Sequence, residues 1–454
     1  MKVKELKRDI LLLLIVSSGV FLFNLGAGSL SSWDEAFYAQ VSREILQTNN
    51  WIDLSWGGFP WSDKPPLYMW ATAVFYRLFG INEFSVRFFS ALSGIATVII
   101  TYLLAGRLFS RRTGLISGIM LAGTYHFVWL GKMGSLDVTF TLFVFLSIFF
   151  FTLAEEKRSS IIYSFLFFGL AFLTKGPGAL LVPMILGLYV LLRRRWDIAF
   201  NRYTAIGVLV FLVITGSWYF PAALHYGKAF VKGHFLDHLI TRATSTMDGH
   251  HGDWLAYINA VLYKGKPWGT FGLLSFPFFV FFTFKEKMCK NFILVVWITV
   301  VFLVFGMVRT KLHWYIIPVY PAVIIVAGWA VERLLKRRAL VFIAAVFLLT
   351  VSIYFPRKGI YTLDFNHDVK DFSGRVMAGV EPGQQVYLYN IQDPGMMFYF
   401  GEKGRYIQKR EELETVQKSR NGAIVITRAD ESDLVKGDVF VPGRESGYAA
   451  VKVK

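Results

Sequence analysis

Residues 137–154 read DVTFTLFVFLSIFFFTLA, an apolar run long enough for an α-helix to cross about 30 Å of hydrocarbon. The chain of 454 residues is 55% hydrophobic and only 17% charged, which is too apolar for an ordinary soluble protein. Further apolar runs lie near residues 9–26, 84–105, 114–131, 160–174, 178–192, 203–221, 268–284, 291–308, 314–331 and 339–356. The pattern predicts a polytopic α-helical membrane protein of about eleven transmembrane helices. A cleaved signal peptide is the alternative for the first run, and the many later spans disfavour it.

Positive charge is concentrated in short connectors between alternate spans. The formal net charge is +17, and basic residues cluster within 2–8, 107–112, 157–158, 193–202, 285–290 and 333–338. The positive-inside rule makes these connectors cytoplasmic, which places the N-terminus inside and, with an odd number of spans, the C-terminus outside. This distribution disfavours a nucleic-acid partner. The single Cys289 falls in a cytoplasmic connector and implies no disulfide framework.

The predicted extracytoplasmic segments carry the residues of chemical interest. They are the loops 27–83 and 222–267, several short turns, and the tail after residue 356. The cytoplasmic connectors are too short for a nucleotide pocket, and the sequence has no Gly-rich phosphate loop and no zinc spacing. An activated substrate used outside must therefore be carried in the lipid. This points to polyprenyl-phosphate chemistry, although many transporters would satisfy the same reasoning.

Loop 27–83 contains SLSSWDEAFYAQVSREIL at residues 29–46, which places two acids at the start of a helix. Ser32 and Glu35 have the spacing of a capping box, so Glu35 has a structural interpretation. Asp34 could likewise be a first-turn acid favoured by the helix dipole. However, Asp34 and Tyr38 share one helix face, and an acid at the end of a membrane helix is a functional candidate.

The same loop continues as WGGFPWSDKPPLYMWATAVFYRLFG at residues 56–80. Pro65 and Pro66 hold Lys64 extended and preset a helix start. Lys64 then lies beside helix N–H groups that have no partner within the helix, a natural place for a phosphate. The alternative is a lysine that extends its charged end to the membrane interface.

Further polar residues lie at predicted outer helix ends. Asp137 opens a span, Lys175 lies in TKGPG, and Arg309 and Lys311 lie in RTKLHWYIIP. Helix capping and interfacial anchoring would account for each of them separately. Loop 222–267 adds four His in HFLDHLITR and DGHHGDW, a loose cluster that could hold a metal ion.

Together these motifs resemble the GT-C membrane glycosyltransferases. In order they are WDEAFYAQVSREIL, DKPPLYMWATAVFYRLFGINEFSVRFFSAL, an Asp opening a span, FLTKGPGAL and KLHWYIIPVYPA, within roughly residues 8–330. Within the superfamily, the chain is similar to the aminoarabinose lipid A transferases and the protein O-mannosyltransferases. It has fewer spans than the aminoarabinose enzymes usually have, and His313 where KLP is common. These departures leave the acceptor class open.

The resemblance implies a site on the extracytoplasmic side of a bacterial inner membrane. Asp34 matches the catalytic acid of the family, with Glu35 beside it, and Asp137 matches a second acid needed for activity. The residues assigned to the donor phosphate are Lys64, Arg242, Tyr38, Trp61, Lys311 and Tyr315. Asp63 and His238 match positions that hold a divalent metal ion beside that phosphate. No nucleotide cofactor is implied.

The tail after Pro356 is more polar and predicts a small separate domain. The stretches QQVYLYNI, MMFYF, GAIVITR and DVFVPG predict strands, and KREELETVQKSR predicts a helix. We therefore expect a transmembrane glycosyltransferase domain, residues 1–356, and an extracytoplasmic α/β domain, residues 357–454. The expected role of the second domain is to cover the active face or to meet the acceptor.

The leading functional hypothesis is transfer of a sugar from a polyprenyl (undecaprenyl) phosphate carrier to lipid A or another envelope glycolipid. The second is protein O-glycosylation by the same chemistry. A third, a transporter or lipid flippase, would need ionisable residues near the bilayer midplane, whereas the polar residues here cluster at helix ends.

Overall fold

The computed structural model describes residues 3–231, 252–419, 422–441 and 447–453, and the chain divides into two compact units. The bundle unit comprises Met1–Leu25, Ser62–Ala71 and Arg87–Tyr361. The sheet unit comprises Gly26–Trp61, Thr72–Val86 and Thr362–Lys454. Most of the first predicted outer loop therefore belongs with the C-terminal residues, and the domain boundary at residue 356 stays a prediction.

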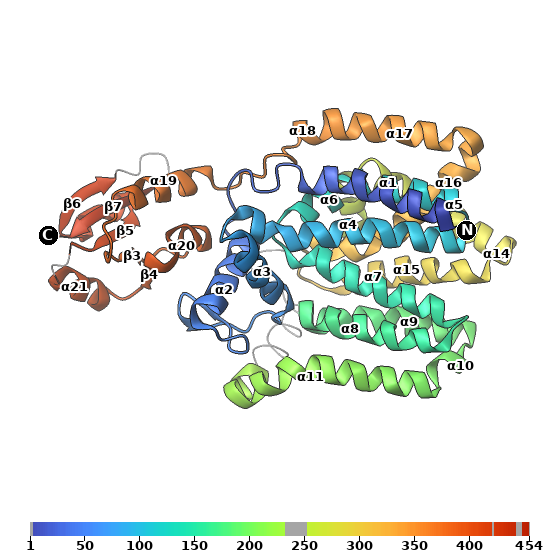
Figure 1. The fold of residues 1–454 in the computed structure, drawn as a ribbon, viewed down its shortest axis with the longest axis horizontal. Helices are drawn as coiled ribbons and strands as arrows, with labels where there is room; N and C mark the ends of the chain where they lie inside the picture. The colour runs from blue at the N-terminus through green and yellow to red at the C-terminus, as the bar shows by residue number, and fades with distance from the viewer. Residues whose placement is uncertain (1–2, 232–251, 420–421, 442–446, 454) are drawn as a thin grey trace. The chain divides into compact units, whose positions relative to one another are not determined.

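Each predicted apolar run is helical over most of its length. The main helices of these runs are α1 (Val3–Leu22), α4 (Glu83–Leu108), α5 (Arg111–Ala122), α6 (Tyr125–Lys132), α7 (Leu136–Ala154), α8 (Ile161–Lys175), α9 (Leu181–Arg193), α11 (Arg202–Val231), α14 (Trp268–Lys285), α15 (Phe292–Met307), α16 (Tyr320–Leu335) and α17 (Ala339–Leu349). Other helical elements are η2 (Gly176–Leu180), α10 (Trp196–Ala199), α13 (Ala256–Lys264), η5 (His313–Val319), the π-helix η7 (Thr350–Tyr354) and α18 (Phe355–Arg357). Helix α8 packs between α7 and α11 (Figure 1).

The helices make the chain a multi-pass membrane protein. Among the described residues, six helical segments are long and apolar enough to cross a membrane, or up to seven if the bent pair α5 and α6 forms one span. The number is below eleven because Arg158–Arg193 and His313–Arg357 each join two of the predicted runs. In addition, α15 has only 16 residues, and α1 is not among these segments. The count of eleven and the orientation of the termini stay predictions.

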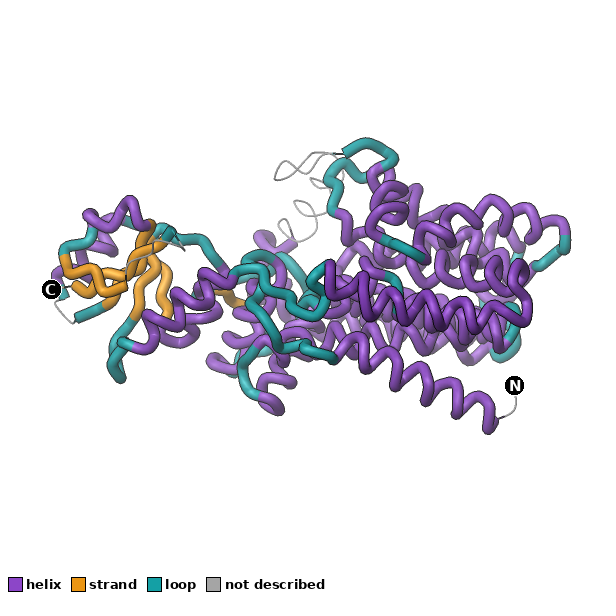
Figure 2. The backbone as a smooth tube through the Cα atoms, turned by 90° about the horizontal axis from the view of Figure 1, so that it is seen from above, coloured by secondary structure: helices purple, strands orange, loops and turns teal. Residues whose placement is uncertain are grey.

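The sheet unit contains the small C-terminal α/β fold that the sequence predicts. Its strands are β3 (Val386–Tyr389), β4 (Gly404–Ile407), β5 (Ile424–Arg428), β6 (Gly437–Val441) and β7 (Tyr448–Val453), in the order β4-β3-β5-β7-β6. β3 pairs parallel with β4 and β5, whereas β7 is antiparallel to β5 and β6. The helices are α19 (His367–Ala378), α20 (Pro394–Phe400) and α21 (Arg410–Lys418). Figure 2 shows the strands of this sheet in orange.

One of the predicted strands is wrong. MMFYF forms the end of α20 instead of a strand. The side chain of Asp393 accepts hydrogen bonds from the N–H groups of Gly395 and Met396 at 2.8 and 3.2 Å, and Pro394 occupies the first helical turn. This local capping starts a helix in a run whose apolar composition also suits a strand.

The first predicted outer loop folds into α2 (Asp34–Thr48), the short hairpin of β1 (Ser55–Trp56) and β2 (Phe59–Pro60), and α3 (Leu67–Phe79). Helix α3 begins directly after Pro65 and Pro66, as predicted. Within the sheet unit, Phe398 of α20 packs with Ala39 of α2 and Tyr76 of α3. The helix that carries Asp34 is thereby fixed to the C-terminal fold.

Candidate active site

Asp137 lies in the first turn of α7 and is almost completely buried. Ser135 caps this helix: its Oγ accepts from the Asp137 N–H at 3.3 Å and donates to Asp137 Oδ2 at 2.7 Å. The other carboxylate oxygen pairs with Lys175 Nζ at the end of α8. Gly176, with φ of 58°, ends α8 there in a conformation that suits glycine. A buried carboxylate and a partly buried ammonium thus neutralise each other at helix ends.

Aromatic rings surround the Lys175 ammonium. Its Nζ lies 4.7 Å from the ring centroid of Tyr315 and 5.5 Å from that of Phe140. A cation over aromatic faces is attracted by the ring quadrupoles. Tyr315, a predicted donor-site residue, is therefore placed at the same helix ends as Asp137 and Lys175.

A chain of three polar side chains lies within the same unit. His126 Nδ1 is 2.9 Å from Tyr320 Oη, and His126 Nε2 is 2.9 Å from His313 Nδ1. His126 and Tyr320 are fully buried. A neutral imidazole donates at one nitrogen and accepts at the other, so the protons of this chain are ordered in one direction.

Lys311, the other predicted phosphate ligand of this segment, has protein partners. Its Nζ donates to the carbonyls of Phe305 and Gly306 at 2.9 and 2.7 Å, at the end of α15, and lies 5.2 Å from the ring centroid of Tyr257. Burial lowers the pKa of the Lys311 ammonium, which Asp253 partly opposes. The geometry is that of a lysine capping a helix C-terminus. Its role at the donor phosphate stays a prediction.

Asp63 and Lys64 belong to the bundle unit and lie in the bend before α3. Asp63 is exposed, and Lys64 is half-buried. Pro65 and Pro66 behind them are buried, which fixes the backbone where the helix begins. The bend presents Lys64 at a helix start, as the sequence predicts.

The acids of α2 belong to the sheet unit and differ sharply in exposure. Asp34 is exposed, whereas Glu35 is fully buried and accepts a hydrogen bond from the Ser31 N–H at 2.8 Å. The predicted capping box is wrong in detail, because the N-cap residue is Trp33 and the Ser32 hydroxyl donates to Asp393 instead. Glu35 nevertheless satisfies a backbone N–H before the helix, which is a structural role.

Two predicted donor-site aromatics also lie in the sheet unit. Tyr38 is buried on α2, one turn from Asp34, and its ring centroid is 6.3 Å from that of Trp61. The predicted set is therefore divided between the units. Asp34, Glu35, Tyr38 and Trp61 lie in the sheet unit, and Asp63, Lys64, Asp137, Lys311 and Tyr315 lie in the bundle unit.

The predicted metal ligands include one residue outside the described part of the chain. His238 and the predicted phosphate ligand Arg242 both fall within residues 232–251, which the structure does not describe. Among the described residues, no group of three or more His, Cys, Asp or Glu side chains is arranged to hold a metal ion. The metal site stays a prediction.

Comparison with known proteins places these features in a family. Residues 63–220 match the family described as dolichyl-phosphate-mannose-protein mannosyltransferase. An uncharacterized protein of Aquifex aeolicus is 30% identical over 77% of this chain and 70% of its own length. The undecaprenyl phosphate-alpha-4-amino-4-deoxy-L-arabinose arabinosyl transferase of Edwardsiella ictaluri is 29% identical, over 66% of this chain and 55% of its own length.

The fold agrees with these matches. The crystal structure of ArnT from Cupriavidus metallidurans bound to undecaprenyl phosphate superposes with a TM-score of 0.80, covering 100% of this chain and 99% of that chain at 21% identity. The chain belongs to the GT-C superfamily of membrane glycosyltransferases. It spans little more than half of the length of the Edwardsiella relative.

In this GT-C protein, sequence reasoning missed the partner of Asp137. Lys175 lies 38 residues further along the chain, yet a signal for the pairing was present. The runs 137–154 and 160–174 are joined by a short connector, so their helices must be antiparallel neighbours, and the start of one meets the end of the other. The contacts of His126 with Tyr320 and His313 join distant segments, and no comparable local signal announces them.

Proposed function

We propose that this GT-C glycosyltransferase moves a sugar from an undecaprenyl-phosphate carrier to a lipid A-like envelope glycolipid on the extracytoplasmic side of a bacterial inner membrane. The observation that carries the proposal is the ion pair of the buried Asp137 and the partly buried Lys175 at helix ends of a GT-C bundle. A cation held in an apolar wall suits a substrate whose anionic phosphate sits at the membrane surface. The names of the arabinosyl transferase relatives support the choice of carrier.

The proposed reaction breaks the bond between sugar C1 and the phosphate oxygen and forms a bond from C1 to an acceptor oxygen. The carrier leaves as a phosphate anion, so the leaving group requires no proton. It requires positive charge that acts more strongly as the bond breaks, and Lys64, Arg242 and Lys175 are the candidates. A divalent ion held by Asp63 and His238 would add to this charge.

The acceptor determines the role of Asp34. If the acceptor is a hydroxyl, the exposed Asp34 carboxylate takes its proton as the new bond forms, an effect commonly worth about 10²–10⁴ in rate. If the acceptor is a phosphate, no proton is removed, and Asp34 orients the acceptor or stabilises positive charge on the sugar. Glu35 is unsuited to either role because it is buried and bonded to the Ser31 N–H.

Reconstituted transfer tests this proposal. Wild-type protein in vesicles with undecaprenyl-phosphate-linked aminoarabinose and lipid A should give a modified lipid A, detected by mass spectrometry. Asp34→Asn should lose at least about 10²-fold in rate while its thermal unfolding stays close to wild type, since a first-turn dipole contact is worth about 0.3–1 kcal/mol. Glu35→Gln is the matched control, because glutamine can still accept from Ser31. Wild-type turnover by Asp34→Asn would remove Asp34 from the mechanism.

Protein glycosylation is the second candidate, and the family description favours it by naming a protein mannosyltransferase. The chemistry at the donor is the same, so the two functions differ only in the acceptor. Mass spectrometry of envelope lipids and of envelope glycoproteins, from cells with and without the gene, separates them. A sugar lost only from the protein fraction would overturn the glycolipid acceptor.

A further inference from the structure

A polar cavity of about 380 Å³ lies wholly within the sheet unit. This volume is within the range of small-molecule sites, roughly 300–1,000 Å³. The residues of its lining that carry polar or aromatic groups of interest are Trp33, Asn390, Gln392, Asp393, Arg428 and Tyr448. None of the functions assigned above uses it.

The cavity occupies the position in the sheet where α/β folds bind ligands. Asn390 and Gln392 follow β3, and Arg428 is the last residue of the adjacent parallel strand β5. The chain runs from β3 to β4 on one side and then to β5 on the other, so the strand order reverses at β3. In open α/β sheets, ligands bind beyond the carboxyl ends of strands at such a reversal.

The backbone at this edge of the sheet adopts a conformation that favours a polar residue at position 390. Asn390 has φ of 52°, in the left-handed region that asparagine tolerates better than most residues, and its N–H donates to the Ile407 carbonyl at 3.0 Å. Asp393 is held by Ser32, whose hydroxyl donates to Oδ1 at 3.0 Å. The Asn390 backbone and the Asp393 carboxylate are therefore held in place.

The charges and rings of the cavity favour an uncharged ligand. Burial and the neighbouring Asp393 raise the pKa of the Tyr448 hydroxyl, and Arg428 partly opposes them, so one acid and one base both face this tyrosine. The acid disfavours a phosphate, and the base disfavours an amine. Trp33 is 70% exposed and offers a flat apolar surface with a polar edge.

We infer that this cavity binds an uncharged sugar ring, with one face against Trp33 and its hydroxyls bonded to Asn390, Gln392 and Asp393. Trp33 directly precedes Asp34, so a ring bound there would lie close to the predicted catalytic acid. The assignment of that ring to the acceptor glycolipid rests on the proposed function, whereas the binding itself does not.

Saturation-transfer NMR on the purified full-length protein in detergent tests the inference. The probe is a β-1,6-linked N-acetylglucosamine disaccharide, which carries no charge. Trp33→Ala and Asn390→Gly should each weaken its binding about fivefold or more, since each removes a direct contact. Glycine at 390 keeps the left-handed backbone. Phe59→Ala, which removes a 58% exposed aromatic of the same unit, is the matched control and should bind like wild type.

Each outcome decides one point. Equal binding by wild type, Trp33→Ala and Asn390→Gly would overturn the inference, as would a wild-type protein that does not bind the disaccharide. Displacement by millimolar inorganic phosphate would identify an anion site and also overturn it. Variant-sensitive binding in a protein that transfers no sugar from undecaprenyl phosphate would reject the proposed function and leave the sugar site standing.

Discussion

The two ends of the bundle unit both pair acids with bases, but in different surroundings. At the Asp137 end, defined by Asp137, Lys175 and His313, the paired side chains of Asp137 and Lys175 are 5% and 17% exposed. At the Glu155 end, defined by Glu155, Arg158, Arg195 and Asp197, the paired side chains of Arg158 and Asp197 are 33% and 49% exposed. Burial makes the first pair costly to break. The second pair is solvated and therefore contributes little to the free energy of unfolding.

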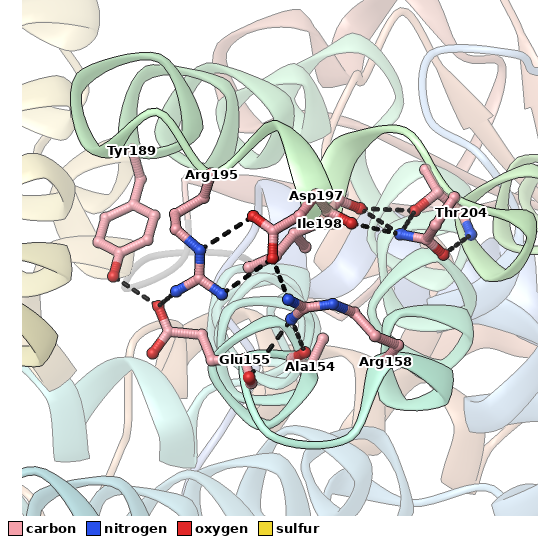
Figure 3. A network of polar contacts seen from close by, with 9 residues as sticks. Ala154, Glu155, Arg158, Tyr189, Arg195, Asp197, Ile198 and Thr204 are labelled. Atoms are coloured by element: carbon pink, nitrogen blue, oxygen red, sulfur yellow. Dashed lines mark hydrogen bonds and ion pairs between the residues drawn. The ribbon is translucent and has the colours of Figure 1, made fainter.

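The Glu155 end is a network in which several groups share the charge. Figure 3 shows Arg158 and Arg195 both pointing toward Asp197. The Tyr189 hydroxyl donates to Glu155 Oε1, with an O–O distance of 2.6 Å. Every member therefore has an alternative partner or access to water. Among the described residues, the side-chain partners of the Asp137 carboxylate are Lys175 and Ser135 alone. The Asp137 end therefore depends on a single ion pair, whereas the Glu155 end shares its charge among several solvated groups.

Removing one member of the buried pair should give the largest effect. Lys175→Met leaves the Asp137 carboxylate buried without its cation, and we expect a loss of about 3–5 kcal/mol in the free energy of unfolding. The shift of the thermal unfolding midpoint in detergent measures this. Transfer activity should fall with it.

The control for this prediction removes both charges. The double variant Asp137→Asn with Lys175→Met should recover much of the lost stability, because no uncompensated charge remains. It should stay inactive if the pair serves the chemistry. A double variant as unstable as the single one would show that the pair is not coupled, and an active double variant would make it purely structural.

A smaller loss of stability is expected from breaking the hydrogen-bonded chain of His126, Tyr320 and His313. His126→Phe keeps a ring of similar shape but leaves Tyr320 Oη and His313 Nδ1 without their bonds to His126. Unpaired buried groups of this kind cost about 1–3 kcal/mol. Tyr320→Phe removes only one of the two bonds and should cost less. Equal unfolding midpoints for wild type and His126→Phe would contradict the hydrogen-bonded chain.

Local features could be predicted from the sequence, and features that depend on distant segments could not. Asp137 was identified because a charged residue at the end of an apolar run is visible locally, and Lys64 because two prolines set a helix start. The start of α3 after Pro66 follows from the same rule and is confirmed. These features, each written within one helical turn, could therefore be predicted.

Features that depend on contact with a second segment of the chain could not be predicted. The role of Lys175 depends on the pairing of α7 with α8, and that of Lys311 on the carbonyls at the end of α15. The sequence also placed Asp34 and Lys64 in one loop, whereas the structure assigns them to different compact units. The strand predicted for MMFYF was wrong for a different reason. The capping residue Asp393 lies directly before this helix, but the apolar run was given more weight.

The smallest expected effect lies at the Glu155 end. The hydrogen bond from Arg195 lowers the pKa of Asp197, and partial burial opposes it. The folded-state pKa therefore lies below the unfolded value of about 3.9, so the pair stabilises the fold above about pH 4 and loses this contribution as the pH falls through the folded-state pKa.

Asp197→Asn should cost at most about 1 kcal/mol at neutral pH, because exposed pairs are solvated and Arg195 keeps Glu155 as a partner. Thermal unfolding of wild type and variant at low and high salt, at neutral and acid pH, measures this difference. It should shrink in high salt, where charges are screened, and vanish in acid. A difference as large as that of Lys175→Met, or one that persists in acid, would mean that the two ends do not differ in the way their exposure indicates.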